Sequence, residues 1–304
     1  MGRRGWMAIA LLLVLAGLPV ALGYQVLHSE WGLQFLVSQL HRIPGVRIEV
    51  GGARGVLAGP LEFDRVIVEH PAVRIDARDL RLDLETAALL GGQIELESAT
   101  IGRVDIVLVK REEKPPSETH FLPRFLTIEA PGLAIRNIGL TLADGQRLEV
   151  ASLRGDLRLT RWRLDAESLL LEDPAGRVAG RVTLRGTLPL TVNSALAGSW
   201  RLPDERSYEF TATTRGRLER LALVLSLSKP ARLAFTGTGV DLTGDARLVG
   251  TLRLNDFDGA PWLPPGSLPR LSGWIALDAR RDAIGLDGTF TADALPNGPL
   301  RVQG

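Results

Sequence analysis

Leu80-Arg81-Leu82-Asp83-Leu84-Glu85 alternates apolar and charged residues without interruption. In an extended chain successive side chains point to opposite sides, so a period of two places the leucines on one side and the charges on the other. A helix would mix the two kinds around its axis. The stretch therefore predicts a half-exposed β-strand with one aliphatic face.

The same alternation recurs along most of the chain. It is seen in Ile94–Glu97, Val104–Leu108, Ile138–Leu142, Leu157–Thr160, Val182–Arg185, Leu221–Leu227, Leu233–Thr236 and Ile284–Phe290. Turn residues such as Asp144-Gly145 separate these segments. One short helix is expected among them, Thr86–Leu90, stopped by Gly91-Gly92. The fold class is therefore mainly β, with strands of antiparallel type.

Helices that could cover the aliphatic faces are missing from this pattern. The strands must then cover one another in a β-sandwich, or curl into a trough that shelters something else. Periodicity alone favours the sandwich.

The N-terminus predicts a membrane anchor. Arg3 and Arg4 precede an apolar run from Trp6 to Leu27, and about 22 residues are enough to span a bilayer core of roughly 30 Å. The two arginines orient the N-terminus toward the cytoplasm. Residues 1–28 are thus expected to be a cytoplasmic N-terminus and a transmembrane helix, with a signal peptide cleaved near Ala21-Leu22-Gly23 as the alternative.

An amphipathic helix is expected over residues 29–45. Ser29 is a suitable N-cap, and Pro44-Gly45 ends the segment. Its predicted apolar face consists of Trp31, Phe35, Leu36, Leu40 and Ile43. Such a helix can plug or cap one end of a β-core, lie on a membrane surface, or do both.

The remaining chain divides into two expected parts. Residues 46–260 contain the β-repeats and a polar loop at 111–123 that includes Pro115-Pro116. Residues 261–304 begin with a Pro-rich bend and open a further set of strands. The alternation continues to the last residues, which suggests a fragment of a longer protein.

Composition argues against several kinds of chemistry. The 36 basic and 35 acidic residues nearly cancel and leave no strong field for nucleic acid. Cysteine is absent, so thiolate metal sites and thiol nucleophiles are excluded. None of the four histidines has a second ligand at metal spacing. No catalytic residue, metal or cofactor is predicted, and the chain is not expected to be an enzyme.

The first 120 residues resemble the N-terminal region of the TamB family of AsmA-like envelope proteins. A hydrophobic anchor and a short helix come first, and a polar insertion at Pro115-Pro116-Ser117-Glu118 comes last. The residues that carry the resemblance, from the helix to the insertion, are Gly32, Leu36, Leu40, Pro44-Gly45, Val50, Gly55, Gly59-Pro60-Leu61, Val73-Arg74-Ile75, Leu80-Arg81-Leu82, Leu89-Leu90-Gly91-Gly92-Gln93-Ile94 and Val104-Asp105-Ile106.

This resemblance implies an elongated, twisted β-sheet, U-shaped in section, with an aliphatic groove. It reverses the preference for a sandwich. It also implies a protein of the Gram-negative inner membrane, single-pass and mostly periplasmic, that bridges to the outer membrane and carries phospholipid. An outer-membrane β-barrel partner of the TamA kind would bind a C-terminal region that this chain lacks. The alternative is a periplasmic scaffold or chaperone for the assembly or secretion of outer-membrane proteins and autotransporters, acting through open strand edges.

The candidate groove-lining residues are the aliphatic members of the alternating strands. They are Ile75, Leu80, Leu82, Leu84, Ile94, Leu96, Val104, Ile106, Leu108, Ile138, Leu140, Leu142, Leu157, Leu159, Val182, Leu184, Leu223 and Leu225.

The anchor hypothesis predicts the topology of the chain. A reporter that is active only outside the cytoplasm should be active when it is fused after Gly51, because the run up to Leu27 would carry the chain across the membrane. Alkaline phosphatase activity of the fusion measures this. A mature N-terminus at Tyr24 would show cleavage instead of anchoring.

Overall fold

The computed structural model describes residues 27–40, 47–70, 73–89, 93–108, 122, 127–142, 145–186, 190–201, 206–242, 245–257, 270–280, 283–292 and 300–303. The expected anchor lies outside these residues except for Leu27 and His28, as do most of the polar loop and the Pro-rich segment 261–269. Among the described residues, no helix combines the length and the apolar character needed to cross a bilayer.

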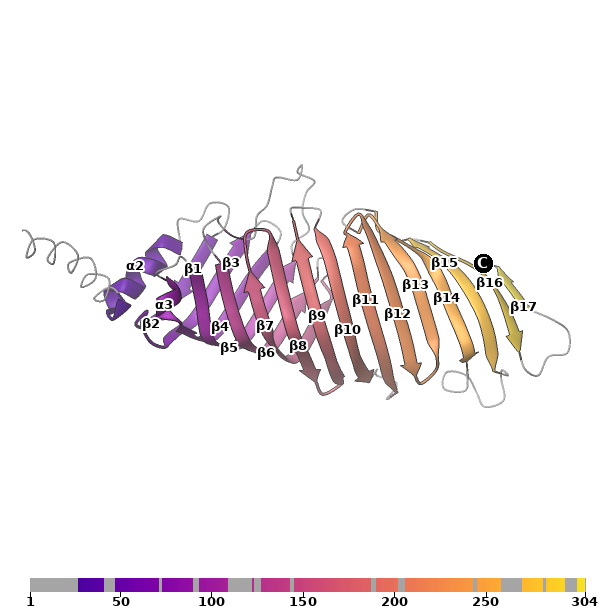
Figure 1. Cartoon of the computed structure of the whole chain (residues 1–304), viewed down its shortest axis with the longest axis horizontal. Helices are drawn as coiled ribbons and strands as arrows, with labels where there is room; N and C mark the ends of the chain where they lie inside the picture. The colour runs from indigo at the N-terminus through magenta and orange to yellow at the C-terminus, as the bar shows by residue number, and fades with distance from the viewer. Residues whose placement is uncertain are drawn as a thin grey trace, which may run out of the picture. The chain divides into compact units, whose positions relative to one another are not determined.

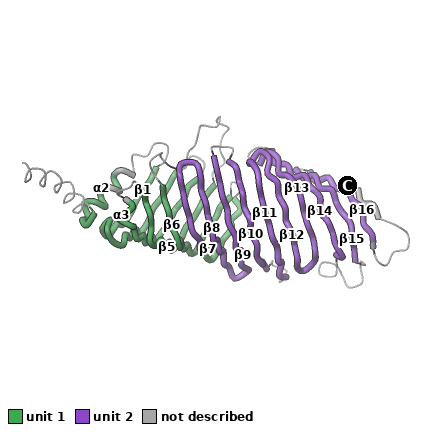
Figure 2. Tube along the Cα trace, viewed as in Figure 1, with its two compact units in different colours: residues 1–114, 125–152 green, residues 115–124, 153–304 purple. Residues whose placement is uncertain are grey.

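The chain forms two compact units (Figure 2). Unit 1 comprises Met1–Lys114 and Phe125–Ser152, and unit 2 comprises Pro115–Arg124 and Leu153–Gly304. Within each unit the strands lie side by side (Figure 1), and helix is scarce. The expectation of a mainly β fold is confirmed.

Unit 1 is a small open sheet with one helix packed on it. Its pairing order is β1–β3–β4–β5–β6, and β2 also pairs with β3. The elements are α2 (Glu30–Leu40), β1 (Arg47–Gly51), β2 (Arg54–Gly55), β3 (Leu61–His70), β4 (Val73–Leu84), α3 (Thr86–Leu89), β5 (Gln93–Leu108) and β6 (Thr127–Thr141). The short helix expected before Gly91-Gly92 is α3.

One pairing corrects the expectation of antiparallel strands. Strands β5 and β6 run parallel, with Val104 opposite Ile138 and Ile106 opposite Leu140. Parallel neighbours need a crossover connection of about a dozen residues or more, and the chain between Leu108 and Thr127 is long enough to supply it. The sheet of unit 1 is therefore mixed.

Strand β7 (Arg147–Leu159) begins in unit 1 and ends in unit 2. From β8 onward each strand of unit 2 pairs antiparallel with the next one in the sequence. The strands are β8 (Arg163–Asp173), β9 (Gly176–Arg185), β10 (Thr191–Arg201), β11 (Ser207–Arg217), β12 (Arg220–Lys229), β13 (Leu233–Val240), β14 (Arg247–Phe257), β15 (Leu271–Arg280), β16 (Ile284–Ala292) and β17 (Leu300–Gln303). Within either unit the described strands pair into one sheet and do not form the two facing sheets of a sandwich.

Helix α2 packs on the sheet of unit 1 through a side other than the predicted one. Leu33 is buried to 1% exposure in a cluster with Leu57, Leu61, Phe63, Ala77, Leu80 and Val104. Trp31 and Phe35, expected on the apolar face of the helix, do not take part in this packing and are 65% and 52% exposed. The N-cap is confirmed, because the backbone N–H of Gly32 donates to Ser29 Oγ at 3.3 Å.

Ion pairs cross the strands on the opposite face of the unit 1 sheet. Asp76 accepts hydrogen bonds from Arg65 and Arg78, and Asp105 accepts them from Arg103 and Arg147. Asp76 lies directly opposite Asp105 across β4 and β5, so the two carboxylates repel each other unless the arginines neutralise them. The hydrogen bond from Arg65 holds the pKa of Asp76 far below its usual range, and that from Arg103 lowers the pKa of Asp105.

Replacing Leu33 by alanine should destabilise unit 1 by about 3 kcal/mol, because it leaves a cavity beneath α2. The matched change Phe35→Ala should cost no more than about 0.5 kcal/mol, since this side chain is largely exposed. Hydrogen exchange of the β3 and β4 amides measures both effects. Equal costs would contradict the orientation of the helix.

The depressed pKa of Asp76 predicts a dependence of stability on pH. The stabilisation is fully present above the pKa of the unfolded chain, about 4, and is lost as the pH falls from there toward the lower folded value. Asp76→Asn should therefore lower the stability of unit 1 at pH 7 by about 1–2 kcal/mol and flatten its decline below about pH 5. Urea unfolding at a series of pH values tests this, and a decline as steep as that of the unchanged protein would contradict it.

Candidate functional site

Strand register sorts the side chains of unit 2 onto two faces. Opposite residues in paired strands share a face, so the partners of Leu223 and Leu225 identify their face in the neighbouring strands. Leu225 in β12 lies opposite Ala212 in β11 and opposite Phe235 in β13. We call the face of β8–β16 that carries these three residues the apolar face.

Aliphatic, aromatic and small residues make up the apolar face. Apart from Asp173 at the turn that ends β8, none of its described positions in β8–β16 is Asp, Glu, Lys or Arg. Its large apolar members are Leu164, Leu169, Leu171, Val178, Val182, Leu184, Val192, Leu196, Trp200, Phe210, Leu221, Leu223, Leu225, Leu227, Leu233, Phe235, Leu248, Leu252, Leu254, Phe257, Leu271, Ile275, Leu277, Ile284, Leu286 and Phe290.

Charged side chains of unit 2 lie on the opposite face, which we call the polar face, and several of them pair with one another. Lys229 Nζ lies 2.7 Å from Glu209 Oε1, and Arg247 Nε donates to Asp278 Oδ1 at 2.7 Å. This last bond lowers the pKa of Asp278. Alternation along each strand therefore separates these charged side chains from the apolar face.

The apolar face is only partly screened from solvent. Among its large apolar residues, Phe235, Leu254 and Phe290 are buried, while Leu225, Leu286 and Ile284 are 38%, 36% and 66% exposed. The others are half-buried. A face with this exposure can take up a further apolar layer.

Two phenylalanines of the apolar face, Phe235 and Phe290, lie over glycines of the sheet. A Cβ added to Gly237 would come within 2.5 Å of Phe235 Cζ, and one added to Gly250 within 2.6 Å of the same atom. A Cβ on Gly273 would approach Phe290 Cδ1 to 3.1 Å. The aromatic rings therefore occupy the space above glycines of their own or an adjacent strand.

Two hydroxyl groups on the apolar face satisfy each other. Ser194 and Thr214 are opposite residues in β10 and β11, and their side-chain oxygens lie 2.8 Å apart. Because each hydroxyl already has a partner, the pair adds little polarity to the surface.

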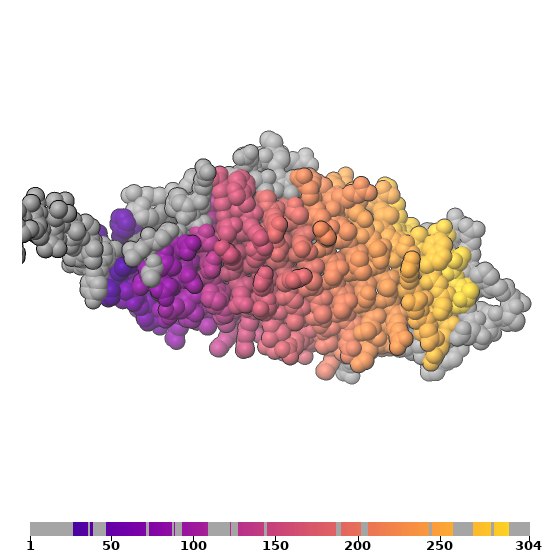
Figure 3. Space-filling model, in the orientation of Figure 1, coloured from indigo at the N-terminus to yellow at the C-terminus, as the bar shows by residue number. Residues whose placement is uncertain are grey.

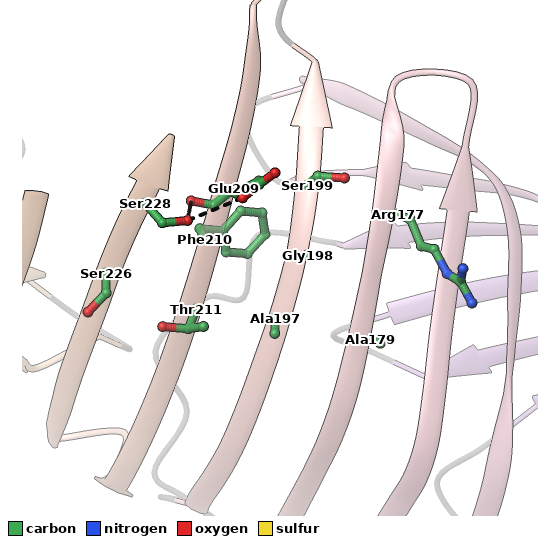
Figure 4. Close-up of a pocket in the computed structure, with 10 residues that line it drawn as sticks. All are labelled: Arg177, Ala179, Ala197, Gly198, Ser199, Glu209, Phe210, Thr211, Ser226 and Ser228. Carbon is green, nitrogen blue, oxygen red and sulfur yellow. Dashed lines mark hydrogen bonds between the residues drawn. The ribbon is translucent and has the colours of Figure 1, made fainter. Parts of the chain in front are cut away.

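The polar face of unit 2 carries a shallow hollow (Figure 4). Its floor consists of the small residues Ala179, Ala197, Thr211 and Ser226, and its rim includes the hydrogen-bonded residues Ser228 and Glu209. Small side chains on neighbouring strands account for the depression. Figure 3 shows no deep opening in the face of unit 2 that is turned to the viewer.

The predicted lining residues of unit 1 also share one face. The register places Leu82, Leu84, Leu96, Ile106 and Leu108 on the side of the sheet that carries Leu33. Ile75, Leu80, Ile94, Val104, Ile138 and Leu140 lie on the same side.

Burial divides these residues into two groups. Leu80 and Val104 lie inside the cluster under α2, and Leu96 is also buried, so the helix and its neighbours already cover part of this face. Leu108 at the end of β5 is 38% exposed, and Ile106 and Leu140 are half-buried.

Other predicted lining residues belong to unit 2 or to the end of unit 1. Val182, Leu184, Leu223 and Leu225 are on the apolar face. Leu157 and Leu159 alternate with the exposed Arg158 in β7 and are half-buried, as is Leu142.

Sequence reasoning missed the part of the apolar face carried by β14 and β15. Leu248, Leu252 and Leu254 repeat at intervals of two to four residues within Arg247–Phe257, and Ile275 and Leu277 do so within Leu271–Arg280. The same period-two criterion would have found them. Phe235 was recognised as a strand residue, but its contact with Gly250 depends on register.

Comparison with protein-family models, curated proteins and solved structures gave no match to this chain.

The contact between Phe235 and the neighbouring glycines predicts the effect of a single methyl group. Gly237→Ala should destabilise unit 2 by about 1–3 kcal/mol, because the new Cβ meets both the ring and the carbonyl oxygen of Val249. Gly285→Ala is the control, since its Cβ would have no neighbour closer than 3.7 Å. Urea unfolding measures both variants. In a Phe235→Ala background the cost of Gly237→Ala should shrink, and an unchanged cost would contradict the packing of the ring.

Proposed function

We propose that this protein is an inner-membrane-anchored periplasmic bridge that carries phospholipid toward the outer membrane, with acyl chains lying on the apolar face. The observation that supports this proposal most is the uncharged, partly exposed apolar face of β8–β16. The anchor predicted at residues 1–28 belongs to the same proposal, as does a sheet that curls into a U-shaped groove.

The dimensions of the apolar face suit acyl chains. Eight strand spacings of about 4.8 Å separate β8 from β16, which amounts to roughly 40 Å across the strands. One acyl chain spans about half of a bilayer core of roughly 30 Å. The face is therefore long enough to hold whole lipid tails.

The energetics favour binding without fixing one position. Each methylene removed from water contributes about 0.8 kcal/mol, so tails prefer the apolar face to the aqueous periplasm. Leucine side chains offer no directional partner to a tail, and the rings of Phe235 and Phe290 lie over glycines of the sheet. Such a surface lets tails slide, which a conduit requires and a catalytic pocket does not.

A scaffold that assembles outer-membrane proteins is the competing proposal. It would act through backbone groups at strand edges. It does not require the apolar face to remain free of charge, and a charge placed on that face separates the two proposals.

Leu225→Asp tests the conduit, and Val224→Asp is a matched control. The two positions are adjacent in β12, lie on opposite faces and are 38% and 42% exposed. Both variants should fold, because each carboxylate can keep water. Only Leu225→Asp should reduce phospholipid crosslinking, several-fold, through a photoreactive residue at Leu252 on the same face.

Each outcome of this experiment has a distinct meaning. Folded Leu225→Asp with undiminished lipid crosslinking would contradict transport along the apolar face and favour the scaffold. Unfolding of Leu225→Asp alone would indicate a tightly packed core at this position. Circular dichroism with thermal unfolding monitors the fold of both variants.

A further inference from the structure

The two aromatic residues of α2 are exposed and stacked on each other. The ring centroids of Trp31 and Phe35 are 5.9 Å apart with an interplanar angle of 22°. Their exposed fractions, 65% and 52%, contrast with 1% for Leu33 on the opposite side of the same helix. The helix therefore presents a second apolar surface that unit 1 does not cover.

Gln34 and Ser38, polar but uncharged, lie beside the aromatic pair, and the exposed Glu30 begins the helix next to Trp31. Gln34 and Ser38 are exposed on this side of α2, and Ser38 Oγ donates to the carbonyl oxygen of Phe35 at 2.7 Å. The headgroup region of a bilayer lies between the apolar hydrocarbon core and water. Trp and Phe beside uncharged polar groups suit this region. We name the surface of Trp31, Gln34, Phe35 and Ser38 the aromatic side of α2.

The chain enters α2 directly from the apolar run. Leu27, the last residue of that run, packs against the core cluster of unit 1. Its carbonyl oxygen accepts a hydrogen bond from the backbone N–H of Ala58 at 2.8 Å. Only His28 and Ser29 separate it from Glu30, the first residue of α2. The end of the run is thus held against the core of unit 1, one short step before the first turn of α2.

We propose that the aromatic side of α2 lies in the headgroup region of the phospholipid bilayer that holds the anchor. This inference rests on the anchor in the proposed function. An 11-residue helix with two aromatic residues binds a membrane weakly by itself, but a tether four residues away keeps its local concentration at the membrane high. Leu33, on the other side of the same helix, connects this contact to the sheet of unit 1.

The absence of cysteine makes a site-specific test possible. The full chain is reconstituted in vesicles of phosphatidylcholine and phosphatidylglycerol, with a fluorescent nitrobenzoxadiazole label on a single introduced cysteine. Gln34→Cys reports the aromatic side, Leu22→Cys reports the anchor, and Thr236→Cys on the polar face of unit 2 is the control. Lipids that carry a nitroxide on the headgroup or deep in the acyl chain quench the label according to its depth.

The expected result is that headgroup nitroxides quench the Gln34→Cys label several-fold more strongly than the Thr236→Cys label. Adding Trp31→Ser and Phe35→Ser should reduce this quenching while thermal stability stays unchanged, because both side chains are exposed.

The other outcomes separate the inference from the anchor. Deep quenching at Leu22→Cys without quenching at Gln34→Cys overturns the inference and leaves the anchor. No quenching at either position overturns both. A blue-shifted Gln34→Cys label that lipid nitroxides do not quench overturns the inference in favour of a protein partner or a second copy of the chain.

Discussion

Backbone hydrogen bonding between neighbouring strands is the constraint on which the molecule depends. A strand shifted by one residue would turn all its side chains to the other face, so register decides whether leucines or charges meet across β11–β16. The register shifts in β8 and β14 keep the apolar residues of these strands on one face. Ser168 in β8 and Asp256 in β14 adopt positive φ angles of 52° at the register shifts. Each absorbs an extra residue, so that Leu169 and Phe257 return to the apolar face.

The two units differ in how far the aliphatic face of their sheet is covered. In unit 1, α2 covers part of the face, and Leu33 completes a buried cluster. In unit 2 the described strands carry apolar residues that remain half-exposed along the sheet. Isolated exposed leucines are common in proteins, whereas a contiguous patch that extends over many strands usually has a function. This contrast makes unit 2 the better place to look for a ligand.

The scarcity of charged and unpaired polar groups on the apolar face limits what it can bind. A pocket that recognises one molecule needs fixed polar partners, and the hydroxyls of Ser194 and Thr214 are already bonded to each other. Phe235 and Phe290 lie over glycines and add no polar group to the face. These properties favour many weak, equivalent positions for a flexible apolar chain.

The sequence by itself determined the strands, their alternating faces, the N-cap at Ser29 and the short helix before Gly91-Gly92. These features depend on neighbours in the chain, so local periodicity and turn chemistry are sufficient to find them. Tertiary structure alone decided that β5 and β6 are parallel, because pairing across the long connection to Thr127 leaves no local signal. It also decided that Leu33 packs inward while Trp31 and Phe35 face outward. Helical periodicity places these residues around an axis but does not say which side meets the sheet, and the available space beside Leu61 and Val104 makes that choice.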